Sequence, residues 1–311
     1  MFRPSIVALA TICFCLSAFE ARAQQKSQLA PQLELPPPIE APSTEPAGSA
    51  PQIVAGSLVS AADQENLGLV AIGNGIGCSG TLLNRQWVLT ADHCVGGGVM
   101  GGTPTPFANL PITAAWTGAT AIPTRYVRYF TSDNRDVALI ELGNGDLGPI
   151  PQNREIITSQ VPNGAAVEKF GRGIYAYAVA GSPDQPAKQD GQYRTANFAV
   201  SFSGTGLYAL SANSAGQVGN GGDSGSSDFL IENGKPTKIV GVQSTCHFTS
   251  CLPGHVCQSK GIVDWTWVTN IDSCNSVQLF SLRQRIIETA FCNGVRGCAE
   301  ATISQLLLLD P

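Results

Sequence analysis

Charged side chains are scarce in this sequence, making up 13% of its 311 residues, against roughly 25% in an average soluble domain. The shortage argues against many surface helices, and the 34 glycines favour a turn-rich, all-β protein. The net charge is −5, and no stretch concentrates Lys or Arg into the basic stripe that binds phosphate groups. We therefore expect no nucleic-acid partner.

Long apolar runs are also lacking. The longest, Ile6 to Phe19, is shorter than the ~20 residues of a membrane-spanning helix. It follows Arg3 and leads into small residues ending at Ala23, which is typical of a secretory signal peptide covering residues 1–23. We expect a secreted or periplasmic protein that makes no membrane contact once this segment is removed.

Paired Cys-x-x-Cys spacings, a common zinc signature, are missing among the ten cysteines. Cys13 and Cys15 leave with the signal peptide, and an even number remains in an exported chain, which favours disulfides. We expect neither a metal nor an organic cofactor. The remaining eight are Cys78, Cys94, Cys246, Cys251, Cys257, Cys274, Cys292 and Cys298.

The rest of the chain divides by composition. Residues 24–52 are rich in Pro, Gln, Ala and Ser and cannot bury a core, so they form a linker or a removable pro-segment. Residues 53–274 read as the folded domain, with a Gly- and Pro-rich crossing at 143–164 between two halves, about 53–145 and 164–274. After Cys274 the apolar spacing turns helical, which predicts a C-terminal helical extension over 275–311 with a second helix at 298–309.

Short apolar runs separated by turn signals predict the strands of a sandwich or barrel. They span residues 67–72, 80–83, 87–90, 137–142, 165–170, 198–202 and 239–243.

Three strings stand out, in the order LTADHC (89–94), DVALI (136–140) and GGDSG (221–225). They place His93, Asp136 and Ser224 at separations of 43 and 88 residues. In this order they resemble the trypsin or chymotrypsin-like serine peptidase family, as a bacterial-type exported member, over roughly 53–274. The resemblance implies two six-stranded antiparallel Greek-key barrels and hydrolysis of a protein or peptide substrate.

The chemistry explains the trio. A serine hydroxyl is a poor nucleophile until an imidazole takes its proton, so His93 would be the base for Ser224. Asp136, next to an apolar strand that would bury it, would orient the imidazole. We expect the rate to rise as His93 loses its proton, at pH above about 6.5. The order His, Asp, Ser also differs from the orders in subtilisins and α/β-hydrolases.

The developing oxyanion needs fixed donors. Gly222, which has no side chain in the way, would supply one backbone N–H and Ser224 the other. Each residue also has a non-catalytic interpretation. His93 could be an ordinary core histidine, Asp136 a strand cap or turn residue, and Ser224 an ordinary residue of a glycine-rich loop. Asp92 stands where the family usually has alanine, and we interpret it as a surface variation without a role.

The resemblance also implies a disulfide between Cys78 and Cys94, which would enclose 15 residues and contribute about 3 kcal/mol. The other six cysteines allow 15 pairings. Among these we prefer Cys292 with Cys298.

Activation by cleavage is a further implication. Ile53-Val54-Ala55-Gly56 resembles the start of a mature family member, whose new ammonium pairs with the aspartate beside the catalytic serine, here Asp223. Gln52, before Ile53, is not the basic residue that tryptic activation needs, so another activating protease or no activation remains open. The simpler alternative is a first β-strand.

By the same resemblance, Val218 lies at the base of the primary specificity pocket. Without an acid there, a small or apolar residue before the cut is favoured, although Asn220 replaces a usual cysteine. Ser244 and Thr245 would pair with substrate backbone, and Gly261 would edge the pocket. Two other functions stay open, an inactive homologue that serves as a binding or adhesion module, and an esterase.

Overall fold

The computed structural model describes residues 53–74, 77–98, 100–129, 135–143, 147–148, 155–179, 182, 184–257 and 264–292. All of them belong to one compact unit. The predicted signal peptide, the whole linker, the second C-terminal helix, Gly261 and Cys298 lie outside these residues. Within them, no helix has the length and apolar character needed to cross a membrane.

The first sheet contains seven labelled strands in the order β6-β5-β2-β3-β4-β8-β7. Only Ile122 separates β6 from β7, and these two pair with β5 and β8 at opposite ends of the sheet. β6 and β7 are thus two halves of one bent strand, which nearly closes the sheet into a barrel. The strands are β2 Leu69–Ile72, β3 Cys78–Leu82, β4 Trp87–Thr90, β5 Ile112–Ala114, β6 Thr120–Ala121, β7 Pro123–Arg128 and β8 Ala138–Leu142.

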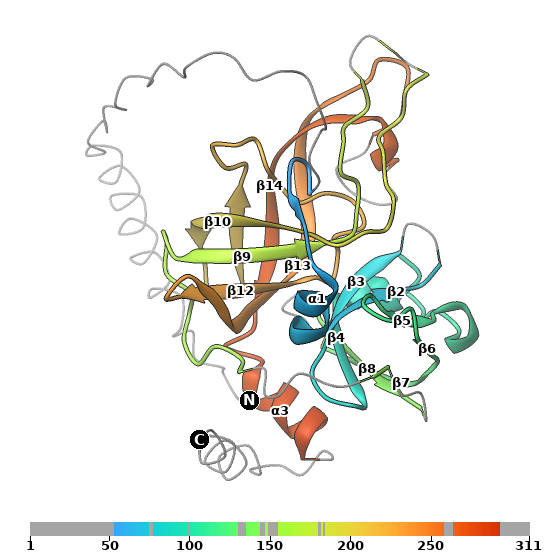
Figure 1. Ribbon diagram of the computed structural model, residues 1–311, viewed down its shortest axis with the longest axis vertical. Helices are drawn as coiled ribbons and strands as arrows, with labels where there is room; N and C mark the ends of the chain where they lie inside the picture. Colours follow the sequence, from blue (N-terminus) through green and yellow to red (C-terminus); the bar gives the residue numbers. More distant parts are fainter. Residues whose placement is uncertain are drawn as a thin grey trace, which may run out of the picture. The chain divides into compact units, whose positions relative to one another are not determined.

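The second sheet runs in the order β1-β10-β11-β14-β13-β12-β9, and pairing of β9 with β10 closes six of these strands into a barrel. The short β1 adds to the edge of β10. Figure 1 shows this sheet, β9 to β14, beside the first. Its strands are β1 Ser57–Leu58, β9 Ala166–Gly171, β10 Arg194–Ser203, β11 Leu207–Ser211, β12 Ser227–Glu232, β13 Lys235–Cys251 and β14 Val268–Gln278.

All strand pairings within the two sheets are antiparallel, and each sheet contains a Greek key. In the first, β5 returns to lie beside β2 of the β2-β3-β4 meander; in the second, β12 returns beside β9 of β9-β10-β11. The predicted all-β fold with two antiparallel barrels is confirmed.

Strand alternation explains how the barrels pack together. Val88 of β4 and Ile140 of β8 point into the first barrel, while the neighbouring Trp87, Leu89 and Leu139 join a second apolar cluster. That cluster also contains residues of the other barrel, among them Phe229 and Val277. One face of β4 and β8 therefore contributes to the packing between the barrels.

The helices differ from expectation. Helix α1, Ala61–Leu67, was not predicted; Ser60 caps it by accepting a hydrogen bond from Asp63 N–H. The predicted helical pattern after Cys274 is wrong for its first residues, because β14 continues to Gln278 and α3 spans Arg283–Phe291. The remaining short helices are α2 Asp92–Val95, η1 Phe107–Asn109 and η2 Trp265–Trp267.

Candidate active site

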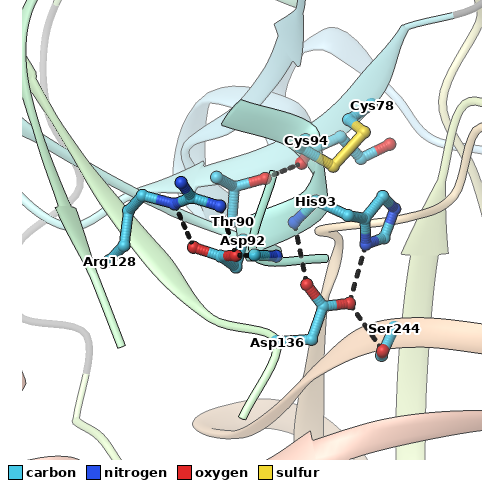
Figure 2. Close-up of polar contacts among 10 residues, drawn as sticks. Cys78, Thr90, Asp92, His93, Cys94, Arg128, Asp136 and Ser244 are labelled. Atoms are coloured by element: carbon cyan, nitrogen blue, oxygen red, sulfur yellow. Dashed lines mark hydrogen bonds and ion pairs between the residues drawn. A yellow bond between two sulfur atoms is a disulfide. The ribbon is translucent and has the colours of Figure 1, made fainter. Parts of the chain in front are cut away.

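The pairing of β4 with β8 brings His93 and Asp136 together. Thr90, at the end of β4, lies opposite Ala138, at the start of β8. Asp136 thus stands just before one strand and His93 just after its antiparallel neighbour. The Asp136 carboxylate accepts the His93 backbone N–H at 2.8 Å and lies 2.7 Å from Nδ1 (Figure 2). Because a carboxylate only accepts, Nδ1 carries the proton and Nε2 is left to accept one.

A second residue, from the other barrel, also donates a hydrogen bond to Asp136. The hydroxyl of Ser244, on β13, donates to Asp136 Oδ2 at 2.6 Å. Burial alone would raise the pKa of Asp136, but the hydrogen bond and charge of His93 and the Ser244 hydroxyl together hold it below its ordinary value. Asp136 is 1% exposed, so it is a buried carboxylate kept ionised by these donors.

Backbone contacts place Ser224 near the end of β4. Its carbonyl accepts the Ser79 N–H at 2.8 Å, and the Ser79 carbonyl accepts the Thr90 hydroxyl at 2.9 Å. A Cβ on the next residue, Gly225, would lie 2.1 Å from Thr90 Oγ1, so only glycine allows this approach. Among the described residues, no hydrogen bond joins the Ser224 hydroxyl to the His93 ring. Such bonds are often long before substrate binds.

Two backbone N–H groups lie in the segment that carries the Ser224 side chain, those of Gly222 and of Ser224 itself. The N–H groups of Gly222 and Ser224 donate to none of the described residues. Gly222 has φ +94°, and a Cβ there would lie 2.7 Å from the Gly173 Cα. Glycine is therefore required at this position, and the two N–H groups remain available to an anionic oxygen.

The side chain of Asp223, between Gly222 and Ser224 in the chain, is fully buried. Its two carboxylate oxygens accept the backbone N–H groups of Gly173 and Asn220, each at 2.8 Å. Burial raises the pKa of Asp223 to about 6. Ile53 is buried among residues of the second barrel, and no hydrogen bond or ion pair joins it to Asp223 in the described part of the chain.

Asp92 corrects the sequence interpretation. It is not a surface residue: it is fully buried and forms two hydrogen bonds with the Arg128 guanidinium, at 2.6 and 2.7 Å (Figure 2). No local sequence signal links the two residues, because they lie 36 positions apart.

Six described cysteines form three disulfides, Cys78–Cys94, Cys246–Cys274 and Cys251–Cys257. The first is the pair that the resemblance implied. Cys292 also takes part in a disulfide, while its preferred partner, Cys298, lies outside the described residues. His93 and the sulfurs of Cys78 and Cys94 lie within 4.8 Å of one another. Disulfide sulfurs are not thiolate ligands, so this cluster does not suit a metal ion.

Val218, which the resemblance places at the base of the specificity pocket, lies in a buried apolar cluster. Val218 is 1% exposed and packs with Cys246, Cys274 and Ile271. The Cys274 Sγ lies 3.1 Å from the Gly219 carbonyl oxygen. The Cys246–Cys274 disulfide thus lies against the segment that carries Val218.

The predicted substrate strand has a free side. Beyond Val242, the last β13 residue that faces Ser227 of β12, β13 pairs with no strand other than β14 in the described part of the chain, and Gln243 is the last residue to bond the segment before β12. Thr245 is exposed there, while Ser244 points back to Asp136. Trp265 of η2, which the sequence did not single out, covers Gly221, where an added Cβ would meet its ring at 2.6 Å.

Comparison with known proteins gives two matches. A family model described as trypsin matches residues 53–266. The chain is similar to a curated protein described as the thrombin-like enzyme BpirSP27 of Bothrops pirajai, with 62% identity over 32 residues, which is 10% of this chain and 64% of that sequence. The match therefore covers less than two thirds of this relative's length.

Proposed function

The chain belongs to the trypsin family of serine peptidases, and on that premise we propose that it is an endopeptidase that cuts peptide bonds through an acyl-enzyme. The double contact of His93 with the buried Asp136 carries the proposal. It fixes the imidazole with Nε2 free to accept a proton, which is the state that a general base needs.

In the proposed mechanism the Ser224 hydroxyl attacks the substrate carbonyl while His93 Nε2 takes its proton. Asp136 stabilises the resulting imidazolium and keeps its own charge. The N–H groups of Gly222 and Ser224 bind the oxyanion. His93 then protonates the leaving amine, and water, activated by the same imidazole, hydrolyses the acyl-enzyme.

Substrate would bind as an added strand along the free side of Ser244–Cys246. The proposed pocket base carries Val218 in place of an acid, and the Cys246–Cys274 disulfide lies beside it. We therefore propose a small or apolar residue before the cut, since a lysine or arginine there would be buried without a partner.

Activation would follow cleavage before Ile53 by another protease. The new ammonium would replace backbone donors as the partner of the Asp223 carboxylate and order the neighbouring Gly222 N–H. An exported location fits the three disulfides, which persist in oxidising compartments.

Fluorophosphonate labelling followed by peptide-library cleavage tests the proposal. Labelling of the wild-type chain and its loss in Ser224→Ala are expected. No labelling, with or without removal of residues 1–52, would favour the binding-module alternative. Labelling without cleavage of any peptide would favour an esterase.

A further inference from the structure

A buried ion pair lies beside the proposed His93–Asp136 couple. Asp92 is fully buried, and the Arg128 side chain is 20% exposed. The guanidinium donates to both carboxylate oxygens of Asp92 and, at 2.5 Å, to the Gly102 carbonyl. Asp92 also accepts the Gly101 N–H at 3.2 Å. These hydrogen bonds tie helix α2 and the loop after it to strand β7.

Stability alone is a weak explanation for such a pair. Removing two charges from water offsets most of their attraction, and apolar residues of similar volume stabilise a fold as well or better. The position of the pair suggests another explanation. Asp92 directly precedes His93 in the four-residue helix α2, and Arg128 faces Ala138, two residues after Asp136.

The Arg128 charge reaches the couple. The hydrogen bond that Arg128 donates to Asp92 raises the pKa of Arg128 most, and the negative charges of Asp92 and Asp136 add to this effect. A guanidinium stays charged at every accessible pH. Without Asp92 it would oppose the positive charge that His93 must acquire during attack by Ser224.

We propose that Asp92 and Arg128 are a positioning pair that clamps the helix carrying His93 and, through mutual neutralisation, allows His93 to become protonated. The link to catalysis rests on the proposed function, whereas the effect on His93 protonation does not. Among the described residues, the charged groups near His93 include Asp136 before β8, Asp92 on its own helix, Arg128 from β7 and Arg172, which donates to the Cys78 carbonyl at 3.4 Å. On the other barrel, Asp223 lies next to Ser224.

The test is an NMR titration of the three histidines, His93, His247 and His255, in the full chain. This readout needs no turnover, and it follows the His93 ring separately from the Asp223 carboxyl group. In Asp92→Asn, the unpaired Arg128 charge should move the His93 midpoint to lower pH by about one pH unit, the effect of a unit charge at roughly 10 Å in an effective dielectric of about 20.

Arg128→Met should move the midpoint the opposite way, because it leaves Asp92 unpaired, and it serves alone if Asp92→Asn does not fold. The double variant Asp92→Asn/Arg128→Met should return the midpoint close to the wild-type value. Glu141→Gln is the matched control. It removes the ion-pair partner of Arg125, which lies on β7 like Arg128. The Arg125 side chain is 57% exposed, so solvent screens its charge and the His93 midpoint should not shift.

Opposite shifts in the two single variants support the proposal, because a loosened helix would not reverse the sign. Unchanged midpoints, or shifts in one direction, in folded variants would overturn it. Labelling of the wild-type chain by a fluorophosphonate tests the proposed function separately, so either idea can fail while the other stands.

Discussion

The hydroxyl of Ser244 donates to Asp136 Oδ2 at 2.6 Å, and this bond joins the two barrels at the proposed catalytic couple. Asp136 precedes β8 of the first barrel and Ser244 lies on β13 of the second. The buried carboxylate is therefore held from both sides, by His93 and by Ser244. Several properties of the site depend on this arrangement.

Ser244→Ala should lower kcat/KM about tenfold. The substitution removes one hydrogen bond to a buried, charged carboxylate and so raises the pKa of Asp136 toward its ordinary value. Ser227→Ala is a suitable control, because the buried Ser227 hydroxyl has no hydrogen-bond partner among the described residues, and its loss should leave kcat/KM unchanged. Equal rates for both variants would remove Ser244 from the account.

Asp136→Asn should reduce kcat by roughly 10⁴-fold without unfolding the protein. The amide can present a donor to His93 Nδ1, which favours the tautomer that cannot accept the serine proton. Steady-state kinetics with a peptide substrate measures the loss. Asp272→Asn, at an exposed aspartate of β14, should keep wild-type activity. An Asp136→Asn variant within tenfold of wild type would contradict the assigned role.

The Cys246–Cys274 disulfide should limit the residue that precedes the cut. Replacing both cysteines by alanine frees space beside Val218, so kcat/KM for a large apolar residue relative to alanine should rise about 10- to 100-fold. Cys251→Ser/Cys257→Ser removes another disulfide of the same strand and should leave the preference unchanged. The same preference in both double variants would show that the pocket lies elsewhere.

Cleavage before Ile53 should change how stability depends on pH. In the uncut chain the pKa of Asp223 is raised to about 6, so its contribution to stability is fully present below about pH 4 and is lost as the pH rises through 6. A new ammonium beside the carboxylate reverses this loss. At pH 7 the cleaved form should have a Tm higher by roughly 5 °C or more, and the gain should shrink below about pH 6.

Asp223→Asn provides the control for this experiment, because it has no charge for the ammonium to stabilise. Cleavage of this variant should give no pH-dependent gain in Tm. A cleaved wild-type chain with the same pH dependence as the uncut chain would remove the Ile53–Asp223 pair from the proposal.

The sequence predicted the all-β class and seven of the fourteen strands in the described residues, because apolar runs such as 87–90 and 137–142 are bounded by clear turn signals. It failed where two patterns coincide. Val277 lies at a position that fits the helical spacing of the apolar residues after it, yet β13 pairs with residues 275–278 and extends β14. Helix α1 was missed because it is only seven residues long, and its formation depends on Ser60 at its start.

In the candidate site, too, residues with a local sequence signal were predicted and residues whose role depends on distant partners were not. His93, Asp136 and Ser224 stand in short strings with local signals, so they were predicted. The burial of Asp92 and the second role of Ser244 depend on partners far along the chain, Arg128 and Asp136. Cysteine pairing likewise depends on strand register, since Cys246 and Cys274 face each other only in the folded sheet.

The most direct test of the account is the rate at which a fluorophosphonate modifies the chain, with the modified peptide located by mass spectrometry, in wild type and His93→Ala. The account predicts one adduct, on Ser224, that forms at least 1,000-fold more slowly without the imidazole. An adduct on another residue, or equal rates in the two proteins, would contradict the claim that His93 activates Ser224.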